Sequence, residues 1–462
     1  MAVVPGRDAA PVIGLPLLRD AEPTRPIAWL GGGRAVTVHA FLADVAAAAE
    51  RLPPGRHALT LCRDRYAFLV GFGAVARRRQ TCLLPPSHQC AIVHALLREH
   101  EASYAFGEAA AIADIAGAVV LPAPNGGRTP PADVPDVPAG HCVAIGLTSG
   151  STGKSQAHRK HWDALHESTA RNDAAIADAF GLDRSVTTHI VATVPPQHMY
   201  GFETTVLLPL LGRYAAHADR PLFPADVARV LAEIPEPRIL VTTPVHLAAL
   251  LREESSGWPR LAGLVVATAP LDPELALRAE HVFGAPLLEL FGATETCVIA
   301  SRRTALETDW RLHPGITLVP RPDGTGVRTP YLAEPVPLQD IVELVSTSRF
   351  RLCGRNTDLL EIAGKRASLA ALTRELLAVP GILDGVFVQY DEPDGSGVRR
   401  MAALAVAKPG VSAAMIRDRL RQRIDPVFLP RPLRLVDALP RNATGKLPRR
   451  SVLDVLAGKA PR

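Results

Sequence analysis

The sequence carries, at residues 147–155, the stretch Leu147-Thr148-Ser149-Gly150-Ser151-Thr152-Gly153-Lys154-Ser155. The apolar run Cys142–Leu147 comes directly before this loop and predicts a strand that leads into it. Backbone N–H groups in a glycine-rich loop, together with Ser and Thr hydroxyls, can wrap phosphate oxygens. The same composition also suits a plain flexible turn, so the loop needs support from the rest of the chain.

Two families of phosphate-binding loop compete for this stretch. Gly153-Lys154-Ser155 ends like a P-loop NTPase motif, but that motif needs a glycine where this chain has Thr148. Thr148–Gly153 instead resembles the first six residues of Thr-Ser-Gly-Ser-Thr-Gly-x-Pro-Lys, the signature of the adenylate-forming superfamily of acyl-CoA synthetases, peptide-synthetase adenylation domains and luciferases. The chain departs from that signature at Ser155 and Gln156, which leaves open which residue replaces the missing lysine.

A second segment, Phe291-Gly292-Ala293-Thr294-Glu295, resembles the family's Tyr-Gly-x-Thr-Glu. The resemblance implies that Glu295 ligates Mg²⁺, that Thr294 contacts the α-phosphate and that Phe291 packs on adenine, with Gly292 beside it. One carboxylate combined with phosphate and water oxygens is a common way to hold Mg²⁺. Taken alone, the segment could equally be a helix-capping threonine and a solvated glutamate.

A third segment, Ala267-Thr268-Ala269-Pro270-Leu271, resembles the family turn that touches adenine through its backbone, which implies nucleotide contacts at Ala269 and Pro270. A fourth resemblance assigns Asp340 to the aspartate that accepts hydrogen bonds from both ribose hydroxyls, a role that suits the several acceptor sites of a carboxylate. The alternatives are an ordinary strand-to-helix turn and a loop aspartate.

The C-terminal part holds the last two resemblances. Gly354-Arg355-Asn356-Thr357-Asp358 is similar to the family hinge, which implies that Arg355 reaches the ribose or phosphates and leaves Thr357 and Asp358 as alternative hinge residues. The stretch from Pro440 to Arg449 is similar to the family's Pro-x-Thr-x-x-Gly-Lys-x-x-Arg and implies that Lys446 bridges the substrate carboxylate and the α-phosphate. A salt-bridged surface loop and a basic tail are the respective alternatives.

The spacing of apolar runs predicts an α/β fold. Large parallel sheets flanked by helices are expected in residues 1–354, and a small mobile α+β domain in residues 355–462. The predicted strands are Ala58–Cys62, Thr81–Leu84, Cys142–Leu147, His189–Val194, Ile239–Thr242, Leu264–Ala267 and Leu287–Leu290, with paired strands around Asp394-Gly395. The predicted helices are Tyr66–Arg78, Ala91–His100, Pro224–Ile234, Pro273–Phe283, Leu369–Ala378 and Ser412–Ile424. Pro122–Gly140 reads as a surface linker.

The acid-binding pocket is expected where parallel strands end, because ligands of open α/β sheets bind at the carboxyl ends of strands. The candidate substrate-binding residues are His198, Tyr200, Gly201, Thr243 and Thr268. His198 is also compatible with a buried structural histidine.

Composition narrows the class of protein. The chain has 462 residues, of which 47% are hydrophobic and 21% charged, with a net charge of +5. The basic residues are spread along the chain, which argues against nucleic acid, and no long uncharged apolar run predicts a membrane span. No secretory signal is recognisable at the N-terminus, so a cytoplasmic location is expected, and the six scattered cysteines read as reduced packing residues.

Together the resemblances imply an AMP- and pyrophosphate-producing ligase that uses ATP and Mg²⁺ to activate a carboxylic acid as an acyl-AMP. The altered loop followed by His158-Arg159-Lys160 resembles the synthetases of aryl-polyene and xanthomonadin pigment biosynthesis, which implies an aromatic acid such as a hydroxybenzoate and an acyl carrier protein as acceptor. Free CoA is the alternative acceptor, and a non-catalytic nucleotide-binding module is the third interpretation. Arginines between Arg417 and Arg450 would suit either acidic acceptor. The sequence leaves the acid and the oligomeric state open.

Overall fold

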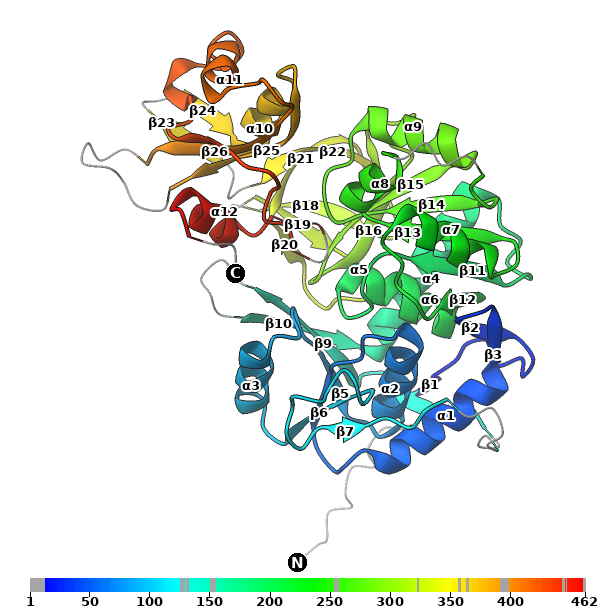
Figure 1. Ribbon diagram of the computed structural model, residues 1–462. Coiled ribbons are helices and arrows are strands. Elements are labelled where there is room, and N and C mark those ends of the chain that lie inside the picture. Colours follow the sequence, from blue (N-terminus) through cyan, green and yellow to red (C-terminus); the bar gives the residue numbers. More distant parts are fainter. Residues whose placement is uncertain are drawn as a thin grey trace, which may run out of the picture. The chain divides into compact units, whose positions relative to one another are not determined.

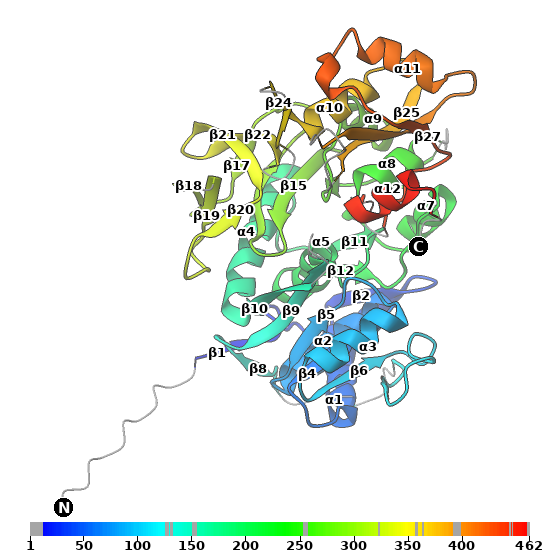
Figure 2. The ribbon, with the colours of Figure 1, turned by 90° about the vertical axis from the view of Figure 1, so that its left-hand side faces the viewer.

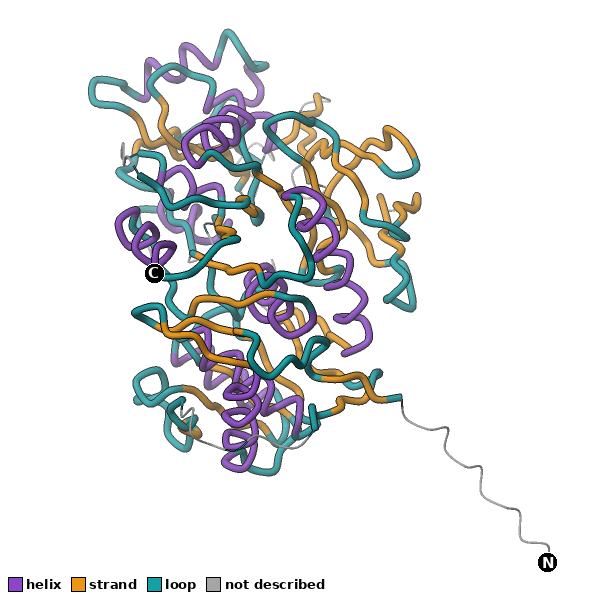
Figure 3. The backbone as a smooth tube through the Cα atoms, turned by 90° about the vertical axis from the view of Figure 1, so that its right-hand side faces the viewer, coloured by secondary structure: helices purple, strands orange, loops and turns teal. Residues whose placement is uncertain are grey.

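The computed structural model describes residues 13–124, 129, 133–149, 155–252, 257–321, 324–355, 359–362, 365–390, 399–442, 445 and 447–459. The chain forms two compact units, each described by itself below. Unit 1 comprises Met1–Glu307, His313–Gly315 and Pro330–Ala333, and unit 2 comprises Thr308–Leu312, Ile316–Thr329 and Glu334–Arg462. Strands and helices follow one another along most of the chain (Figure 3). The predicted domain boundary at Gly354 falls inside unit 2 and, as a boundary between functional domains, remains a prediction.

The first sheet of unit 1 has the strand order β10-β9-β5-β4-β6-β7. Its strands are parallel except for β10, which runs antiparallel to β9: β4 (His57–Thr60), β5 (Thr81–Leu84), β6 (Ser103–Gly107), β7 (Val119–Val120), β9 (Cys142–Ser149) and β10 (Ser155–His161). Side chains alternate between the two faces of a strand. Leu59 and Leu83 therefore pack with α3 (Cys90–Glu99), whereas Ala58 and Cys82 pack with α1 (Val38–Arg51) and α2 (Arg65–Arg77) on the opposite face (Figure 1).

The second sheet of unit 1 has the order β16-β15-β14-β13-β11-β12-β2-β3, in which only the end strands β16 and β3 are antiparallel to their neighbours. Its strands are β2 (Pro26–Leu30), β3 (Arg34–Thr37), β11 (Thr188–Ala192), β12 (Tyr214–His217), β13 (Arg238–Thr242), β14 (Gly263–Val266), β15 (Leu287–Ala293) and β16 (Cys297–Arg302). One face is covered by α7 (Pro224–Ala232), α8 (Pro244–Leu250) and α9 (Pro273–Phe283). The other is covered by α4 (Trp162–Phe180), α5 (Met199–Phe202) and α6 (Leu208–Leu211).

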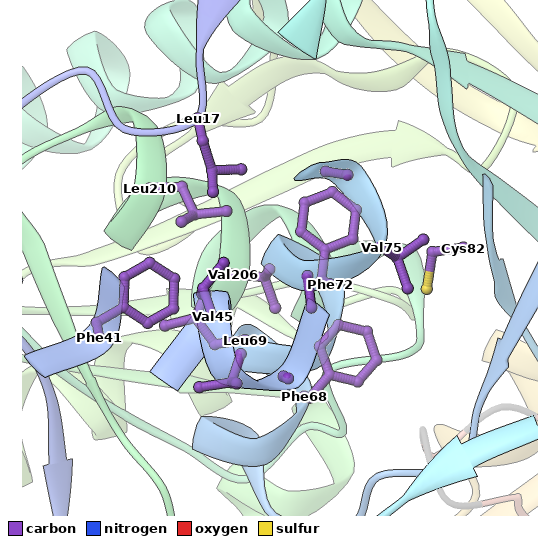
Figure 4. Packing of buried hydrophobic residues seen from close by; sticks show 14 of the residues in the cluster. Leu17, Phe41, Val45, Phe68, Leu69, Phe72, Val75, Cys82, Val206 and Leu210 are labelled. Atoms are coloured by element: carbon purple, nitrogen blue, oxygen red, sulfur yellow. The ribbon is translucent and has the colours of Figure 1, made fainter. Parts of the chain in front are cut away.

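A shared apolar layer joins the two sheets of unit 1. Phe68 and Phe72 of α2 pack against Val206 of the π-helical turn η1 (Glu203–Leu207) and Leu210 of α6 (Figure 4). At the start of α2 the fully buried Arg65 donates hydrogen bonds to the carbonyl oxygens of His217, Asp219, Ala192 and Val194, at 2.6 to 3.2 Å. These four bonds satisfy the two terminal nitrogens of the guanidinium, which offsets much of the cost of burying its charge.

Unit 2 is built from small antiparallel sheets and one mixed sheet. Its strands are β17 (Trp310–Leu312), β18 (Thr317–Arg321), β19 (Gly324–Arg328), β20 (Val336–Leu338), β21 (Asp340–Ser346), β22 (Arg349–Arg355), β23 (Leu359–Ile362), β24 (Lys365–Ser368), β25 (Ile382–Gln389), β26 (Met401–Ala407) and β27 (Leu433–Leu435). In the β25-β26-β27 sheet, α10 (Leu369–Leu377) and α11 (Ala413–Leu420) cover one face and α12 (Arg449–Leu456) covers the other (Figure 2). A short 3-10 turn, η3 (Pro426–Phe428), packs with α11.

The α/β fold class is confirmed, and each predicted strand and helix of unit 1 is found within a few residues of its expected bounds. Strands β25 and β26 pair on either side of Asp394-Gly395, although residues 391–398 lie outside the described part. Among the described residues no helix is long and apolar enough to cross a membrane.

Two predictions are wrong. Pro122–Gly140 is not all linker, because β8 (Asp136–Pro138) pairs antiparallel with β1 (Gly14–Pro16) and buries Val137. A strand with one buried side chain and a partner 120 residues away leaves no periodic signal. The packing role also fails for Cys90 and Cys353, which are exposed.

Candidate functional site

The carboxyl ends of parallel strands meet at one edge of the second sheet in unit 1. Ala192 lies opposite Val241, and both Thr242 and Glu289 lie opposite Val266. The residues that follow β11, β13 and β14, and the end of β15, therefore emerge side by side. This edge carries the predicted nucleotide turns and several of the predicted acid-binding residues.

The phosphate loop connects β9 to β10. The last described pair before it joins Ser149 and Ser155, while Gly150, Ser151, Thr152, Gly153 and Lys154 lie outside the described residues. Thr148 Oγ1 and His158 Nε2 form a cross-strand hydrogen bond of 3.3 Å. The predicted role of the loop in nucleotide binding therefore remains a prediction, with Thr148 as its described starting point.

The segment Phe291–Glu295 ends β15 and enters a tight turn to β16. The register shifts between Phe291 and Gly292, and a Cβ atom on Gly292 would lie 2.3 Å from the carbonyl oxygen of Cys297. Thr296 closes the turn, because its Oγ1 accepts a hydrogen bond from the Ala293 N–H at 3.2 Å. Only glycine fits at position 292, which explains why the motif requires it there.

A close contact brings the first two motifs together. A Cβ atom on Gly146 of β9 would lie 2.7 Å from Thr294 Cγ2, so the absence of a side chain at Gly146 is what allows Thr294 to approach. Burial lowers the pKa of His158, and the nearby Glu295 carboxylate acts in the opposite direction. The end of β9 and the Thr294-Glu295 pair are therefore neighbours in the fold, although Thr148 and Thr294 are 146 residues apart in the chain.

Two buried charged residues that sequence reasoning did not assign to the site hold this turn. Lys160 Nζ donates to the Glu295 carbonyl oxygen at 3.1 Å and lies 3.6 Å from Cys297 Sγ. Glu203 Oε2 accepts a hydrogen bond from the Val298 N–H at 3.1 Å. Burial raises the pKa of Glu203 to about 7, whereas its hydrogen bond to Val298 and the charge of Lys160 lower it. The only sequence signal was that Lys160 falls in the basic cluster behind the loop.

The third motif follows β14. Thr268 has φ +88°, a left-handed conformation that is rare for a β-branched residue. Ala269 is half-buried and Pro270 is exposed. Strain of this kind persists where the surroundings fix the backbone, and it is often found at ligand sites.

The predicted acid-binding residues divide into two kinds. Tyr200 donates its hydroxyl to the carbonyl oxygens of Thr242 at 3.1 Å and Val265 at 2.8 Å, and Thr243 caps α8 by accepting the His246 N–H. Both polar groups therefore bind main chain at the strand ends. A Cβ on Gly201 would lie 2.1 Å from the Pro195 carbonyl oxygen, so this glycine allows the chain to turn back on itself. His198 precedes α5 and is half-buried.

A polar chain at the same edge was not predicted. Thr193 Oγ1 lies 2.9 Å from both Thr242 Oγ1 and His246 Nδ1. Burial lowers the pKa of His246, as does the charge of Arg220. Thr193 directly follows β11, Thr242 ends β13, and His246 lies in the first turn of α8, so their position at the ends of buried strands is a signal that could have found them.

Unit 2 carries the remaining predicted residues. Asp340 and Arg355 are cross-strand partners at one end of the β21-β22 ladder, although the side chain of Arg355 is outside the description. Lys446, Thr357 and Asp358 also lie outside the described residues. Beside Lys446 in sequence, Gly445 accepts a hydrogen bond from Arg441 Nη1 at 2.9 Å, and Arg441 pairs with both carboxylate oxygens of Asp384 at 2.9 Å.

The side chains at the motif turns fit a magnesium–nucleotide complex. Among the residues that the structure describes, no group of three or more His, Cys, Asp or Glu could hold a metal by itself. The Glu295 carboxylate and the nearby threonine hydroxyls offer hard oxygen ligands for Mg²⁺. Phosphate and water oxygens would complete its coordination. Gly146 and Gly292 allow the close packing that places Thr294 and Glu295 beside the end of β9.

Comparisons with known proteins agree with this arrangement. A family model described as AMP-binding enzyme matches residues 25–328. A 4-coumarate–CoA ligase of Halorhodospira halophila is 28% identical over 312 residues, covering 65% of this chain and 73% of that protein.

Two solved structures share the fold. The ATP-bound MatB of Rhodopseudomonas palustris has a TM-score of 0.78 at 19% identity, covering 95% of this chain and 97% of that one. The O-succinylbenzoate coenzyme A synthetase of Bacillus subtilis, solved with ATP and magnesium ion, has a TM-score of 0.75 at 18% identity, covering 93% and 97%. At these identities the likeness concerns the fold alone.

Proposed function

The chain belongs to the AMP-binding enzyme family and is an adenylate-forming acid–thiol ligase, and on that premise we propose that it activates an aromatic carboxylic acid and loads it onto an acyl carrier protein. A hydroxybenzoate is the proposed class of acid. The two half-reactions are formation of the acyl-AMP with release of pyrophosphate, and transfer of the acyl group to a phosphopantetheine thiol with release of AMP.

One observation carries the proposal. Thr294 packs against Gly146, two residues before Thr148, and this contact supports assigning the start of the phosphate loop and Glu295 to one site. An acid and an ATP α-phosphate repel each other, so catalysis needs aligned hydroxyls and positive charge more than it needs a protein nucleophile. Bound Mg²⁺ would supply part of that charge, held by Glu295. Thr148 and Thr294 would orient phosphate oxygens, and Lys446 would bring the further cation.

The nature of the acid is supported by the strand-end residues and by a relative named for coumarate. The hydroxyls of Tyr200 and Thr243 bind main chain, so the aromatic ring of Tyr200 is what this residue would offer to the acid, with the half-buried His198 two residues before it in sequence. Acid-dependent exchange of pyrophosphate into ATP tests the proposal: we expect exchange with hydroxybenzoates and weak exchange with fatty acids. Exchange with no acid would favour a non-catalytic nucleotide-binding module.

The acceptor has two candidates. The exposed arginines of unit 2 would suit an acidic carrier protein, and Arg417, Arg419 and Arg450 form no ion pair within the described part of the chain. Free CoA is the alternative, favoured by the relative named as a CoA ligase. Supplying holo carrier protein or CoA to pre-formed acyl-AMP distinguishes them, and faster transfer to CoA would contradict the carrier-protein proposal.

Lys446→Ala tests the adenylation step. Because its ammonium group would neutralise charge only while the carboxylate approaches the α-phosphate, we expect pyrophosphate exchange to fall by about two orders of magnitude or more. Thiol transfer from pre-made acyl-AMP should change much less. An equal loss in both steps would contradict the assignment of Lys446 to adenylation.

A further inference from the structure

We propose that Lys160 and Glu203 are positioning residues that clamp the turn from Glu295 to Val298 and thereby aim the Glu295 carboxylate and the Thr294 hydroxyl at the nucleotide. The inference rests on the proposed function only in naming what the turn binds. No nucleotide-binding role was predicted from the sequence for either residue, although Lys160 ends the basic cluster that follows the phosphate loop. Both are 3% exposed, in a chain whose lysines and glutamates are otherwise mostly at the surface.

The clamp acts on the backbone at both ends of the turn. Lys160, from β10, donates to the Glu295 carbonyl oxygen at 3.1 Å, whereas Glu203, from the π-helical turn η1, accepts the Val298 N–H at 3.1 Å. Tyr331 adds a third contact by donating its hydroxyl to the Thr296 carbonyl oxygen at 3.1 Å. Three main-chain groups within four residues are thus held by side chains from three distant segments.

The turn needs such support because it is strained. Cys297 has φ +62°, which costs free energy for a residue with a Cβ atom. Its carbonyl oxygen also lies so close to Gly292 of β15 that no side chain fits there. Strained backbone persists only where the surroundings over-determine it. Because the Glu295 carbonyl that Lys160 holds belongs to the same residue as the predicted metal ligand, loss of the clamp should misplace that carboxylate directly.

The position of the clamp also separates it from an ordinary core contact. Lys160 and His158 lie on the same face of β10, and His158 contacts Thr148 at the start of the phosphate loop. Lys160 therefore connects β10, the strand that follows the predicted phosphate loop, to the turn that carries Glu295.

The test uses the full chain and three variants. Lys160→Met removes the donor, Glu203→Leu removes the acceptor, and Glu203→Gln keeps a neutral acceptor for the Val298 N–H. We expect the KM for MgATP to rise about tenfold or more in the first two and to stay within about threefold in the third. The KM for the acid should change less than twofold, and calorimetric binding of MgATP without acid should weaken in parallel.

Asp44→Leu is the matched control. Asp44 is a buried carboxylate, 3% exposed, that accepts the Tyr66 hydroxyl at 2.8 Å within α1 and α2, away from the turn. Its loss should lower the melting temperature while leaving MgATP binding by the folded protein unchanged. If Lys160→Met does not fold, the difference in MgATP affinity between Glu203→Leu and Glu203→Gln still tests whether the acceptor atom positions the turn.

The outcomes separate this inference from the proposed function. Lower stability in Lys160→Met and Glu203→Leu with MgATP affinity within twofold of the unmodified chain would make both residues merely structural and overturn the inference. A weaker affinity in Glu203→Gln equal to that in Glu203→Leu would also contradict a clamp that works through the acceptor atom. Failure of the unmodified chain to exchange pyrophosphate with any acid would instead count against the proposed function. It would leave the clamp testable, because MgATP binding depends on the turn without requiring catalysis.

Discussion

The turn that carries Glu295 and the loop that carries Gly445 are both held through main-chain atoms by charged side chains, but the two sets of side chains differ in burial. Lys160 and Glu203 are almost completely buried, whereas the Arg441 and Asp384 side chains are 23% and 33% exposed. Buried groups act in a low dielectric and are costly to remove, while half-exposed ion pairs are screened and contribute little to stability. The first connection should therefore be rigid, and the second easily released.

The largest effect is expected from Gly292→Ala. The new Cβ would lie 2.3 Å from the Cys297 carbonyl oxygen, a backbone atom that cannot move away without opening the turn. We expect unfolding to become easier by about 3 kcal/mol and pyrophosphate exchange to fall by at least about two orders of magnitude. Chemical denaturation and exchange rates measure the two quantities.

Gly140→Ala is the control for Gly292→Ala, because a Cβ on Gly140 would meet nothing within 4 Å. Its stability should change by less than about 1 kcal/mol and its exchange rate should stay normal. If alanine were tolerated at both positions, the Glu295 turn would not be the more rigid of the two connections compared above.

A smaller effect is expected from Gly146→Ala, because the atom that the new Cβ meets, Thr294 Cγ2 at 2.7 Å, belongs to a side chain that can shift. We expect exchange to fall about tenfold to a hundredfold through displacement of Thr294. The double variant Gly146→Ala with Thr294→Ser removes the opposing methyl group and keeps the hydroxyl, so it should recover much of the loss. No recovery would mean that the two motifs do not meet through this contact.

Arg441→Met tests the exposed side of the comparison. The stability cost should stay below about 1 kcal/mol, because half-exposed ion pairs contribute little. Its effect should instead fall on the adenylation step that we propose for Lys446, lowering pyrophosphate exchange several-fold while thiol transfer from acyl-AMP changes less. Parallel loss in both steps would contradict a role in placing the loop next to Gly445.

The smallest effect concerns the strained turn after β14. Thr268→Gly and Thr268→Ala both lose the threonine side chain, but only glycine adopts φ +88° without strain. Thr268→Gly should therefore be more stable than Thr268→Ala by about 1 kcal/mol. Thermal unfolding of the pair measures the difference, and equal melting temperatures would mean that the left-handed conformation carries no strain.

The sequence allowed the strands and helices of unit 1 to be predicted because their signal is local. The Leu264–Ala267 run alternates with a helix that begins at Pro273, and both are found. Candidate site residues could be named from the sequence only where a motif is contiguous, as at Thr148 and Glu295, and their roles stay predictions. Lys160 lies 135 residues from Glu295, and Glu203 lies 95 residues from Val298, so nothing local marks them as neighbours. Short strands such as β8 were missed because their pairing partners are equally remote.

The buried Arg65 sets a limit on how this protein could be shortened or recombined. Its guanidinium ties the first helix after β4 to the ends of β11 and β12, where the strands of the other sheet begin to form the site. A fragment that starts after residue 65 would leave those four carbonyl oxygens without their donor, and lysine could not reach them all. Chimeras that exchange acid specificity with a relative should therefore keep the first 80 residues and the second sheet from the same parent.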